Sequence, residues 1–564
     1  MTLAPSTAFA FRFVESLIAH GLQHIVVSPG SRNQALNLAA AEFAERGQLH
    51  LYVRVDERDA GFLALGLALE SKTPVAIVTT SGTAVANLHP ATLEAHHSGV
   101  PLLLLTADRP LEERGIGTSQ ITWQPGMFGA ALRWEEDVPP ARDVQSAEAN
   151  ARALADSTWK RLTQDDGDPR TIGPVQLNIS FAEPLSSADF PEAAEQLPTI
   201  VPDARSTTAH VLSRGPRTLV IAGSRAGAGA EELAHAGGWP LIAEVASGSR
   251  YGRNLVHGYR ELLRDGELTS GIERIVVFGY PTLSREVPAL ISKAADGVEV
   301  VFVRGPGSED YNPAHRVTNA VTAVTVEEGE DDRDWLGQWM RASQAAQSAL
   351  DARLASESPA QVAPNVEASR SSDVKERKEF AEAELAAART PLTRELLALA
   401  VWGATWPHDR LLLGASRIIR VLDSVAPGKK IPVFSNRGLA GIDGTISTGI
   451  GIAHASGATT RVLLGDLTLL HDAGGMLLMP GEASPRIQVI VGNDRGGTIF
   501  DSLEVAGTAQ PQHFDRVIRT SVNVDLKQLA AAYGWEYLEV RTVADLERAL
   551  VTPGAGPQLI EVPL

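Results

Sequence analysis

RVLLGDLTLL (residues 461–470) and RIQVIVGNDRGGTIF (residues 486–500) each contain a short apolar run that ends in small and polar residues. Such runs predict buried strands that are followed directly by a turn or a helix. In an open parallel sheet, ligands collect at the carboxyl ends of the strands. The two stretches therefore predict a parallel α/β sheet whose ligand lies near Asp466, Asn493 and Asp494.

The same alternation of apolar runs and helical periodicity occurs in two other parts of the chain. Near the N-terminus, helical patterns are expected at 57–71 and 83–97, between short apolar runs. The predicted strands there are HIVVS (24–28), LYVRV (51–55), VAIVTT (75–80) and PLLLLTA (101–107). A second set begins near residue 217 with TLVIAG, PLIAEV, RIVVFG and VEVVFVRG. The sequence thus predicts an α/β protein with three doubly wound parallel-sheet domains.

The expected domain limits follow from these sets and from a polar segment between the second and the third. We predict a first domain at 1–190, a central domain at 205–350, a linker at 351–388 and a third domain at 389–564. Few large apolar residues occur within the segment from Ser356 to about Ala388. Its first half is typical of a linker and its second half of a solvated helix.

Composition excludes several classes of function. The chain has 564 residues, a formal net charge of −18 and no cysteine. An acidic surface repels nucleic acid and anionic lipid, and without cysteine there is neither a disulfide nor a thiolate nucleophile. Charged residues interrupt the apolar N-terminal segment, and no long uncharged apolar run follows, so we expect no signal peptide and no membrane insertion. We predict a cytoplasmic protein.

The polar residues after the two quoted strands can hold a divalent cation. The Asp466 carboxylate and the Asn493 side-chain carbonyl provide oxygen ligands, which magnesium prefers, with manganese as the alternative. Such an ion keeps room for diphosphate oxygens. In the structural alternative, Asp466 caps the following helix and Asn493 and Asp494 form a turn.

A glycine–aspartate pair followed by an asparagine at this interval resembles the diphosphate motif of the thiamine-diphosphate enzymes. Further motifs make the resemblance more specific: SPGSRNQAL (28–36), DERDAGFLALGLA (56–68), TADRP (106–110), QPGMFG (124–129), SNRGLAGIDGTISTGIGIA (435–453) and GGTIF (496–500). In combination they resemble the synthases of menaquinone biosynthesis. The resemblance implies decarboxylation of 2-oxoglutarate and addition of the succinyl carbanion to isochorismate. An acetolactate-synthase-like enzyme or a simple 2-oxo acid decarboxylase is the alternative.

The resemblance also assigns the cofactor site. Glu57 would hydrogen-bond the aminopyrimidine ring of thiamine diphosphate, whereas its structural alternative is an acidic residue in the first turn of a helix. The cofactor would also contact Ile442, Gly465, Asp466, Leu467 and Asn493. The metal ligands would be Asp466 with either Asn493 and the Arg495 carbonyl, or Asp494 and the Gly496 carbonyl. By this resemblance, the first domain binds the pyrimidine and the third binds the diphosphate.

Two dicarboxylate substrates require several cationic side chains, and arginine suits bidentate binding of carboxylates. The resemblance implies catalytic roles for Glu57, Arg32 and Gln120. Substrate contacts are expected from Ser31, Arg32, Arg109, Ser119, Gln120, Arg285, Ser416, Arg420, Arg437, Ile499 and Phe500. Ser119 stands where an asparagine is common in the family, and Ser284 stands where some relatives carry a lysine, so contacts with the second substrate are the least well defined.

The family arrangement also implies an oligomer. The cofactor would lie between the pyrimidine-binding domain of one subunit and the diphosphate-binding domain of another. We therefore expect a homodimer at least, with a homotetramer as the alternative.

Overall fold

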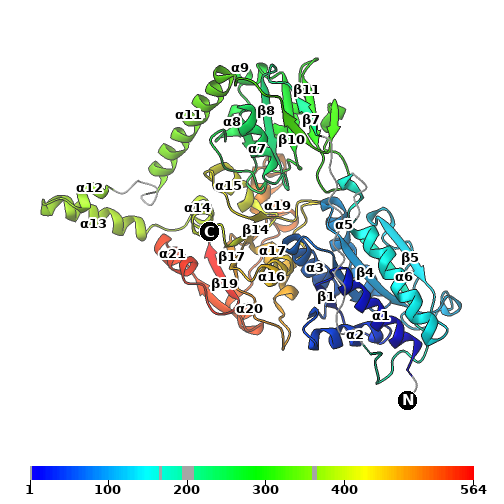
Figure 1. Ribbon diagram of the computed structural model, residues 1–564. Coiled ribbons are helices and arrows are strands. Elements are labelled where there is room, and N and C mark those ends of the chain that lie inside the picture. Colours follow the sequence, from blue (N-terminus) through cyan, green and yellow to red (C-terminus); the bar gives the residue numbers. More distant parts are fainter. Residues whose placement is uncertain (1–2, 164–167, 193–208, 359–364) are drawn as a thin grey trace.

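The computed structural model describes residues 3–163, 168–192, 209–358 and 365–564, and Figure 1 shows them as three α/β lobes. Within these residues, every pair of neighbouring strands in the sheets is parallel. Helices separate most of these strands along the chain. The predicted doubly wound α/β class is confirmed.

The first and third sheets have the same topology in the described residues. The first has the order β2-β1-β3-β4-β6-β5, and the third the order β15-β14-β16-β17-β19-β18. Their strands are β1 (His24–Val27), β2 (His50–Val53), β3 (Val75–Thr79), β4 (Leu102–Asp108), β5 (Trp134–Val138), β6 (Val175–Ser180), β14 (Arg410–Leu413), β15 (Val433–Phe434), β16 (Thr460–Gly465), β17 (Ile487–Asn493), β18 (Glu536–Glu539) and β19 (Gln558–Pro563). In each sheet the chain reverses its winding direction between the first and third strands, the place where ligands of such sheets bind.

The central lobe has a smaller sheet of the order β12-β11-β10-β8-β9 and a separate pair, β13-β7. Its strands are β7 (His210–Leu212), β8 (Thr218–Ala222), β9 (Leu241–Ala243), β10 (Arg274–Phe278), β11 (Glu299–Val303), β12 (Asn319–Val321) and β13 (Val324–Val326). The helices α7 (Gly229–Gly237), α10 (Glu286–Ser292) and α11 (Arg333–Glu357) accompany it. Trp335 and Trp339 of α11 are buried and join one of its two apolar cores.

The domain limits stay predictions. Residues 193–208, which include part of the predicted boundary between the first two domains, lie outside the described residues, as do 359–364 of the predicted linker. The linker range also contains the end of α11, then α12 (Val366–Ser369) and α13 (Val374–Ala388). None of the α13 residues is buried, and in Figure 1 this helix projects from the three lobes.

One helix prediction is wrong in detail. The pattern at 83–97 predicts one helix, but the structure has α4 (Thr83–Asn87) and α5 (His89–Ser98), with Leu88 between them. Pro90 lies at the start of α5, where its missing N–H leaves no helical hydrogen bond unmade. A proline further inside one long helix would remove such a bond, so the chain begins a new helix here.

The first and third domains share an apolar core built around α3 (Glu57–Ser71) and α16 (Thr445–Ser456). Asp56 caps α3 by accepting a hydrogen bond from the Arg58 N–H at 2.8 Å. On the opposite face of the first sheet, α1 (Pro5–His20), α2 (Gln34–Glu45) and α6 (Val144–Thr163) cover a separate core. The helix that starts at Glu57 is therefore the one packed against the third domain.

Glycines allow α3 and α16 to approach each other closely. A Cβ atom on Gly66 would lie 2.1 Å from the Thr448 carbonyl oxygen, and one on Gly451 would lie 2.3 Å from the Leu63 carbonyl oxygen. Both contacts are with backbone, which cannot rotate away. The distance between the two helices is therefore set by the absence of side chains at these positions.

We expect Gly66→Ala to force α3 and α16 apart and to destabilise the protein by about 1–3 kcal/mol. Gly403→Ala is the matched control, because Gly403 lies in α14 (Arg394–Ala404) with no atom within 4 Å of its added Cβ. There, alanine should be neutral or stabilising by up to about 1 kcal/mol. Thermal unfolding of both variants measures the effect, and equal midpoints would contradict the packing argument.

Candidate active site

The third domain has a pocket of about 200 Å³ at the carboxyl ends of β14, β16 and β17. It lies where the sheet topology predicts a ligand, beside the switch between β14 and β16. The predicted residues Ser416, Ile442, Gly465, Asp466, Leu467, Asp494, Ile499 and Phe500 all line it, together with Gly496. Among the described residues, its walls come only from position 394 onward, so Glu57 is not part of them.

Two polar atoms of this pocket lack a partner. Asp466 Oδ2 and Ser416 Oγ are both buried without a hydrogen bond. Burial of such atoms is unfavourable unless a ligand satisfies them. Ser416 is also the N-cap of α15 (Arg417–Val425), so the positive end of a helix dipole faces the same space. A diphosphate with a divalent cation fits this set of groups.

Both carboxylates and arginines line the pocket. Burial raises the pKa of Asp466 to about 6, and the nearby Asp494 carboxylate adds to the effect. Arg394 Nη2 donates to Asp494 Oδ2 at 2.9 Å, and Thr498 Oγ1 donates to the same oxygen. Two acidic groups that face a shared buried space favour a bound cation. In the described residues, no three His, Cys, Asp or Glu side chains form a metal cluster, so a backbone carbonyl would have to complete the ligand set.

Asn493 lies apart from this arrangement. Its Nδ2 donates to Glu561 Oε1 at 2.6 Å, and its Oδ1 accepts the Arg495 N–H at 3.2 Å. Asn493 and Arg495 line a different polar cavity, on whose wall Asp466 also lies. Of the two alternative ligand sets, the structure brings Asp494 and Gly496, rather than Asn493 and Arg495, into the pocket with Ser416.

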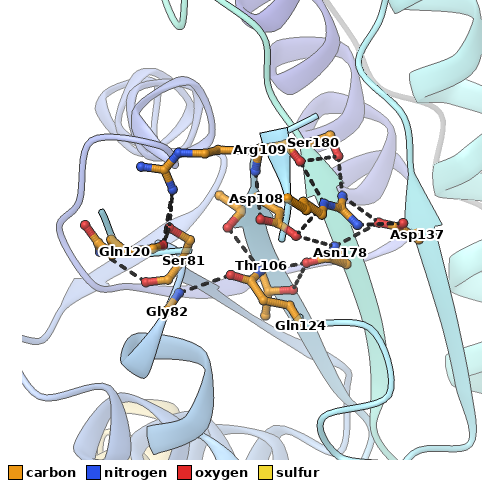
Figure 2. Close-up of polar contacts among 12 residues, drawn as sticks. Ser81, Gly82, Thr106, Asp108, Arg109, Gln120, Gln124, Asp137, Asn178 and Ser180 are labelled. Atoms are coloured by element: carbon orange, nitrogen blue, oxygen red, sulfur yellow. Dashed lines mark hydrogen bonds and ion pairs between the residues drawn. The ribbon is translucent and has the colours of Figure 1, made fainter. Parts of the chain in front are cut away.

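The first domain gathers a second set of predicted residues at the carboxyl ends of β1, β3 and β4. Arg109 Nη1 donates to Ser81 Oγ at 3.3 Å and to the Gln120 carbonyl at 3.1 Å. Gln120 Nε2 in turn donates to the Ser81 carbonyl at 3.1 Å, as Figure 2 shows. Burial and the positive charge of Arg109 lower the pKa of Arg32. Two neighbouring arginines with no bidentate carboxylate partner in the described contacts are suited to an anionic substrate.

A buried polar network supports Arg109 from below (Figure 2). Arg114 Nη1 and Nη2 bind Asp137 at 2.8 and 3.0 Å, and Arg114 Nε lies 3.0 Å from Asp108. Arg114 Nε also donates to the Arg109 carbonyl at 2.9 Å. Asn178 donates to both carboxylates at 3.0 and 2.8 Å. The network fixes the backbone of the loop that carries Arg109 and leaves the Arg109 side chain available.

Glu57 begins α3 and is partly exposed. Its Oε2 accepts a hydrogen bond from Asn87 Nδ2 at 3.2 Å. Among the described residues, no other hydrogen bond and no ion pair involves this carboxylate, so its second oxygen is without a hydrogen-bond partner there. Ser31 and Ser119 are exposed as well.

The remaining predicted arginines lie where the third domain meets the central one. Arg437 Nε and Nη2 donate to Thr282 at 2.9 Å, while Arg437 Nη1 is buried without a partner. Arg420 donates to the Ser416 carbonyl at 3.0 Å, and burial lowers its pKa, as do Arg437 and Arg260. Arg285 is far more exposed, with 78% of its side chain accessible, and pairs with Glu504 at 3.3 Å. Arg420 thus adjoins the pocket through Ser416, and Arg285 does not line it.

Sequence reasoning missed several residues of these sites, among them two arginines and a serine. Arg394 and Arg417 line the third-domain pocket, and Ser81 links Arg109 to Gln120. Ser81 follows a predicted strand in TTSGTA, a signal of the same kind as SPGSR. Arg394 begins a helix distant in sequence from the motifs, so only the folded structure reveals it.

The fold and the pocket define a thiamine-diphosphate-dependent enzyme of the α/β type. Residues 8–127 match the family model described as the thiamine pyrophosphate enzyme, N-terminal TPP binding domain. Proteins of Leifsonia xyli and Clavibacter michiganensis, each 51% identical over 99% of this chain and 96% of their own length, are named 2-succinyl-5-enolpyruvyl-6-hydroxy-3-cyclohexene-1-carboxylate synthase. A protein of Kineococcus radiotolerans with the same name is 43% identical over 99% of this chain and 96% of its own length.

The chain belongs to this synthase family, whose members are thiamine-diphosphate-dependent transferases of menaquinone biosynthesis. The family, the enzyme class and the organic cofactor predicted from the sequence are thereby confirmed. Among the described residues, no helix is long and apolar enough to cross a membrane.

The Arg114 network yields a prediction about stability. Arg114→Met leaves Asp108 without its buried counter-charge, and breaking a buried ion pair costs about 3–5 kcal/mol. We therefore expect a clearly lower midpoint of urea unfolding. Arg152→Met is the control, because the Arg152 side chain is 52% exposed and lies 3.9 Å from Glu148; its effect should stay within about 0.5 kcal/mol. An unchanged midpoint for Arg114→Met would show that the network does not support the loop.

Proposed function

We propose that this chain decarboxylates 2-oxoglutarate and adds the resulting succinyl unit to isochorismate, forming 2-succinyl-5-enolpyruvyl-6-hydroxy-3-cyclohexene-1-carboxylate and carbon dioxide. The observation that carries the proposal is the pairing of a diphosphate pocket in the third domain with the Arg32, Arg109 and Gln120 cluster in the first. A simple 2-oxo acid decarboxylase has no need for a second set of carboxylate-binding arginines. The acetolactate-like alternative is therefore less well supported.

When bound, thiamine diphosphate would supply a nucleophilic carbon and a cationic ring that takes up the electron pair released on decarboxylation. Glu57 would hold a proton at the ring nitrogen of the aminopyrimidine, which requires a carboxylate with a free oxygen. Ile442 would support the bent cofactor, and Leu467 would pack beside the diphosphate. Ile499 and Phe500 would form the apolar wall that keeps water from the reacting atoms.

The arginines would divide the substrate carboxylates between them. We assign Arg32 and Arg109, with Ser31 and Gln120, to the anionic groups nearest the first domain. Ser416 and Arg420 would bind beside the cofactor pocket, and Arg437 would bind the second substrate with its unpaired Nη1. Ser119 and Arg285 would contact this substrate only if the exposed segments that carry them approach it.

We propose magnesium, with manganese as a substitute, bound by Asp466, Asp494 and the Gly496 carbonyl. The support is their common position around the pocket, whereas the Asn493 side chain is held by Glu561. A hard cation between two carboxylates and a carbonyl leaves positions for phosphate oxygens.

This assignment predicts a contrast between adjacent residues. Asp494→Ala should abolish magnesium-dependent binding of thiamine diphosphate, while Asn493→Ala should weaken it by only about tenfold to a hundredfold, because outer contacts of metal sites have effects of that order. Isothermal titration of thiamine diphosphate at fixed magnesium measures both. The reverse ranking would assign the metal to Asn493 and the Arg495 carbonyl.

We also propose a homodimer in which each site uses the first domain of one subunit and the third domain of the other. The support is that the described walls of the diphosphate pocket include no first-domain residue. The cytoplasmic location stays a prediction from the sequence.

Mixing two inactive variants tests the reaction and the shared site together. Glu57→Gln and Asp466→Asn should each abolish consumption of isochorismate in the presence of 2-oxoglutarate, thiamine diphosphate and magnesium. After the two are unfolded and refolded together, mixed dimers carry one intact site, so about a quarter of wild-type activity should return. No recovery would place each site within one chain. Wild-type turnover of pyruvate without turnover of 2-oxoglutarate would overturn the synthase assignment.

A further inference from the structure

Two buried carboxyl groups meet between the first and third domains, outside the proposed substrate and metal sites. Asp59 lies in the first turn of α3, two residues after Glu57, and Asp472 follows α17 (Asp466–His471). Asp59 is 2% exposed and Asp472 is fully buried. Their side chains hydrogen-bond each other. A contact of this kind between two acidic groups requires a proton between them.

Among the described residues, one counter-charge, that of Arg58, lies within ion-pair distance of the pair. Asp472 Oδ2 accepts the N–H groups of Ile446 and Ser447 at 2.7 and 2.9 Å, which caps α16. Asp59 Oδ1 has no hydrogen-bond partner, and Arg58 Nη2 lies 3.7 Å from it. A Cβ on Gly474 would lie 2.7 Å from Asp59 Oδ2, so the pocket closes tightly around the pair.

The charged groups that face the pair have other partners. Arg58 Nη2 donates to the His471 carbonyl at 3.0 Å, and Arg54 Nη1 binds both Glu482 oxygens at 2.9 Å. Asp56, the cap of α3, adds negative charge nearby. Two ionised carboxylates in such a site would repel each other at short range with little screening. Burial raises the pKa of Asp59 to about 6 and that of Asp472 well above its usual value.

The two groups do not play equal parts. Asp472 is the more deeply buried of the two, and its Oδ2 accepts two backbone N–H groups at the start of α16. Asp59 has the Arg58 guanidinium 3.7 Å from its Oδ1, which favours a negative charge there. The hydrogen bond between the two groups lowers the pKa of Asp59 and raises that of Asp472, so Asp472 carries the proton and donates it to a charged Asp59.

We propose that Asp59 and Asp472 share one proton at neutral pH, and that this hydrogen bond is a positioning contact that fixes the start of α3, and with it Glu57, on the third domain. The part that concerns Glu57 rests on its role in the proposed function. The shared proton itself does not. In the proposed dimer, the contact would join the helix that serves one active site to the segment that follows Asp466 in the other.

The first test detects the proton directly. Infrared spectra of the whole protein at neutral pH should show the band of a buried protonated carboxylic acid. Asp59→Asn and Asp472→Asn should each remove it, because an amide then supplies the hydrogen bond without a shared proton. Asp373→Asn, which changes the cap of the exposed helix α13, should leave the band unchanged. A band that survives both substitutions in the pair would overturn the proposal, whatever the enzyme's substrates.

The second test uses stability against pH. The folded-state pKa of Asp59 is raised from 3.8 to about 6, so its contribution to stability is complete below the unfolded value and is lost as pH rises through the folded value. The midpoint of thermal unfolding of Asp59→Asn should therefore increase relative to that of the wild type as the pH rises from about 4 to 7. A constant difference across this range would contradict the shared proton.

The third test separates positioning from general stability. Asp59→Asn preserves the hydrogen bond to Asp472, so its kcat should stay within about twofold of the wild type. Asp59→Ala removes the bond, and misplacement of Glu57 should lower kcat by roughly tenfold to a hundredfold. Binding of thiamine diphosphate with magnesium, measured by titration calorimetry, should change little in either variant, because the diphosphate pocket is intact.

At alkaline pH the wild type should lose kcat as the pair loses its proton, whereas Asp59→Asn should not. Equal kcat profiles for all three proteins would refute the positioning role while leaving the proposed reaction in place.

Discussion

The close contact between α3 and α16 is the constraint on which the rest of the molecule depends. The two helices belong to different domains, yet they form one continuous apolar core. Gly66 and Gly451 permit the approach because their missing side chains leave room for backbone carbonyls. Since α3 begins at Glu57 and α16 is capped by Asp472, the same contact sets the distance between the Glu57 carboxylate of the first domain and the segment that follows Asp466. An apolar interface of this kind has little directionality, so the buried carboxyl pair is the element that can define how the helices are oriented along it.

The first and third sheets repeat one strand order, and this repetition explains why polar residues at strand ends carried so much information. The switch in winding direction lies between β1 and β3 in one sheet and between β14 and β16 in the other. Arg32 and Ser81 follow the first pair of strands, and Ser416 and Asp466 follow the second. A sequence that shows short apolar runs ending in such residues therefore predicts both the fold class and the two edges where ligands bind. It did not predict β5 and β18, which are edge strands, nor β6 and β19, which follow long connections from the preceding predicted strands. Nor did it predict Arg394, whose place in the pocket results from the packing of α14 against the third sheet.

Charge is distributed so that an acidic protein can bind anions. The net charge is −18, but arginines near the sites fall into two groups with different partners. Arg114 is buried between two carboxylates and organises the loop, whereas among the described residues Arg32 and Arg109 donate to carbonyl or hydroxyl oxygens and form no ion pair. An incoming carboxylate gains a stronger interaction from a guanidinium held by neutral acceptors than from an arginine already in an ion pair. Sequence motifs alone could not separate these groups, because TADRP and the LEERG segment that follows it both offer arginines at the same edge of the sheet.

Residue types alone do not decide which side chains belong to the proposed metal site. Asn493 and Asp494 are neighbours, both offer a side-chain oxygen, and both lie at the end of β17, so their residue types cannot decide which one faces the pocket. Successive side chains of a strand point to opposite faces, and the third sheet provides different partners on its two faces. Glu561 of β19 holds the Asn493 amide on one side and also accepts the Tyr537 hydroxyl at 2.6 Å. On the other side, Asp494 meets Arg394 and Thr498 near Asp466. The proposed assignment of the metal to Asp494 therefore depends on what β18, β19 and α14 place beside β17, which are elements that the motif itself does not contain.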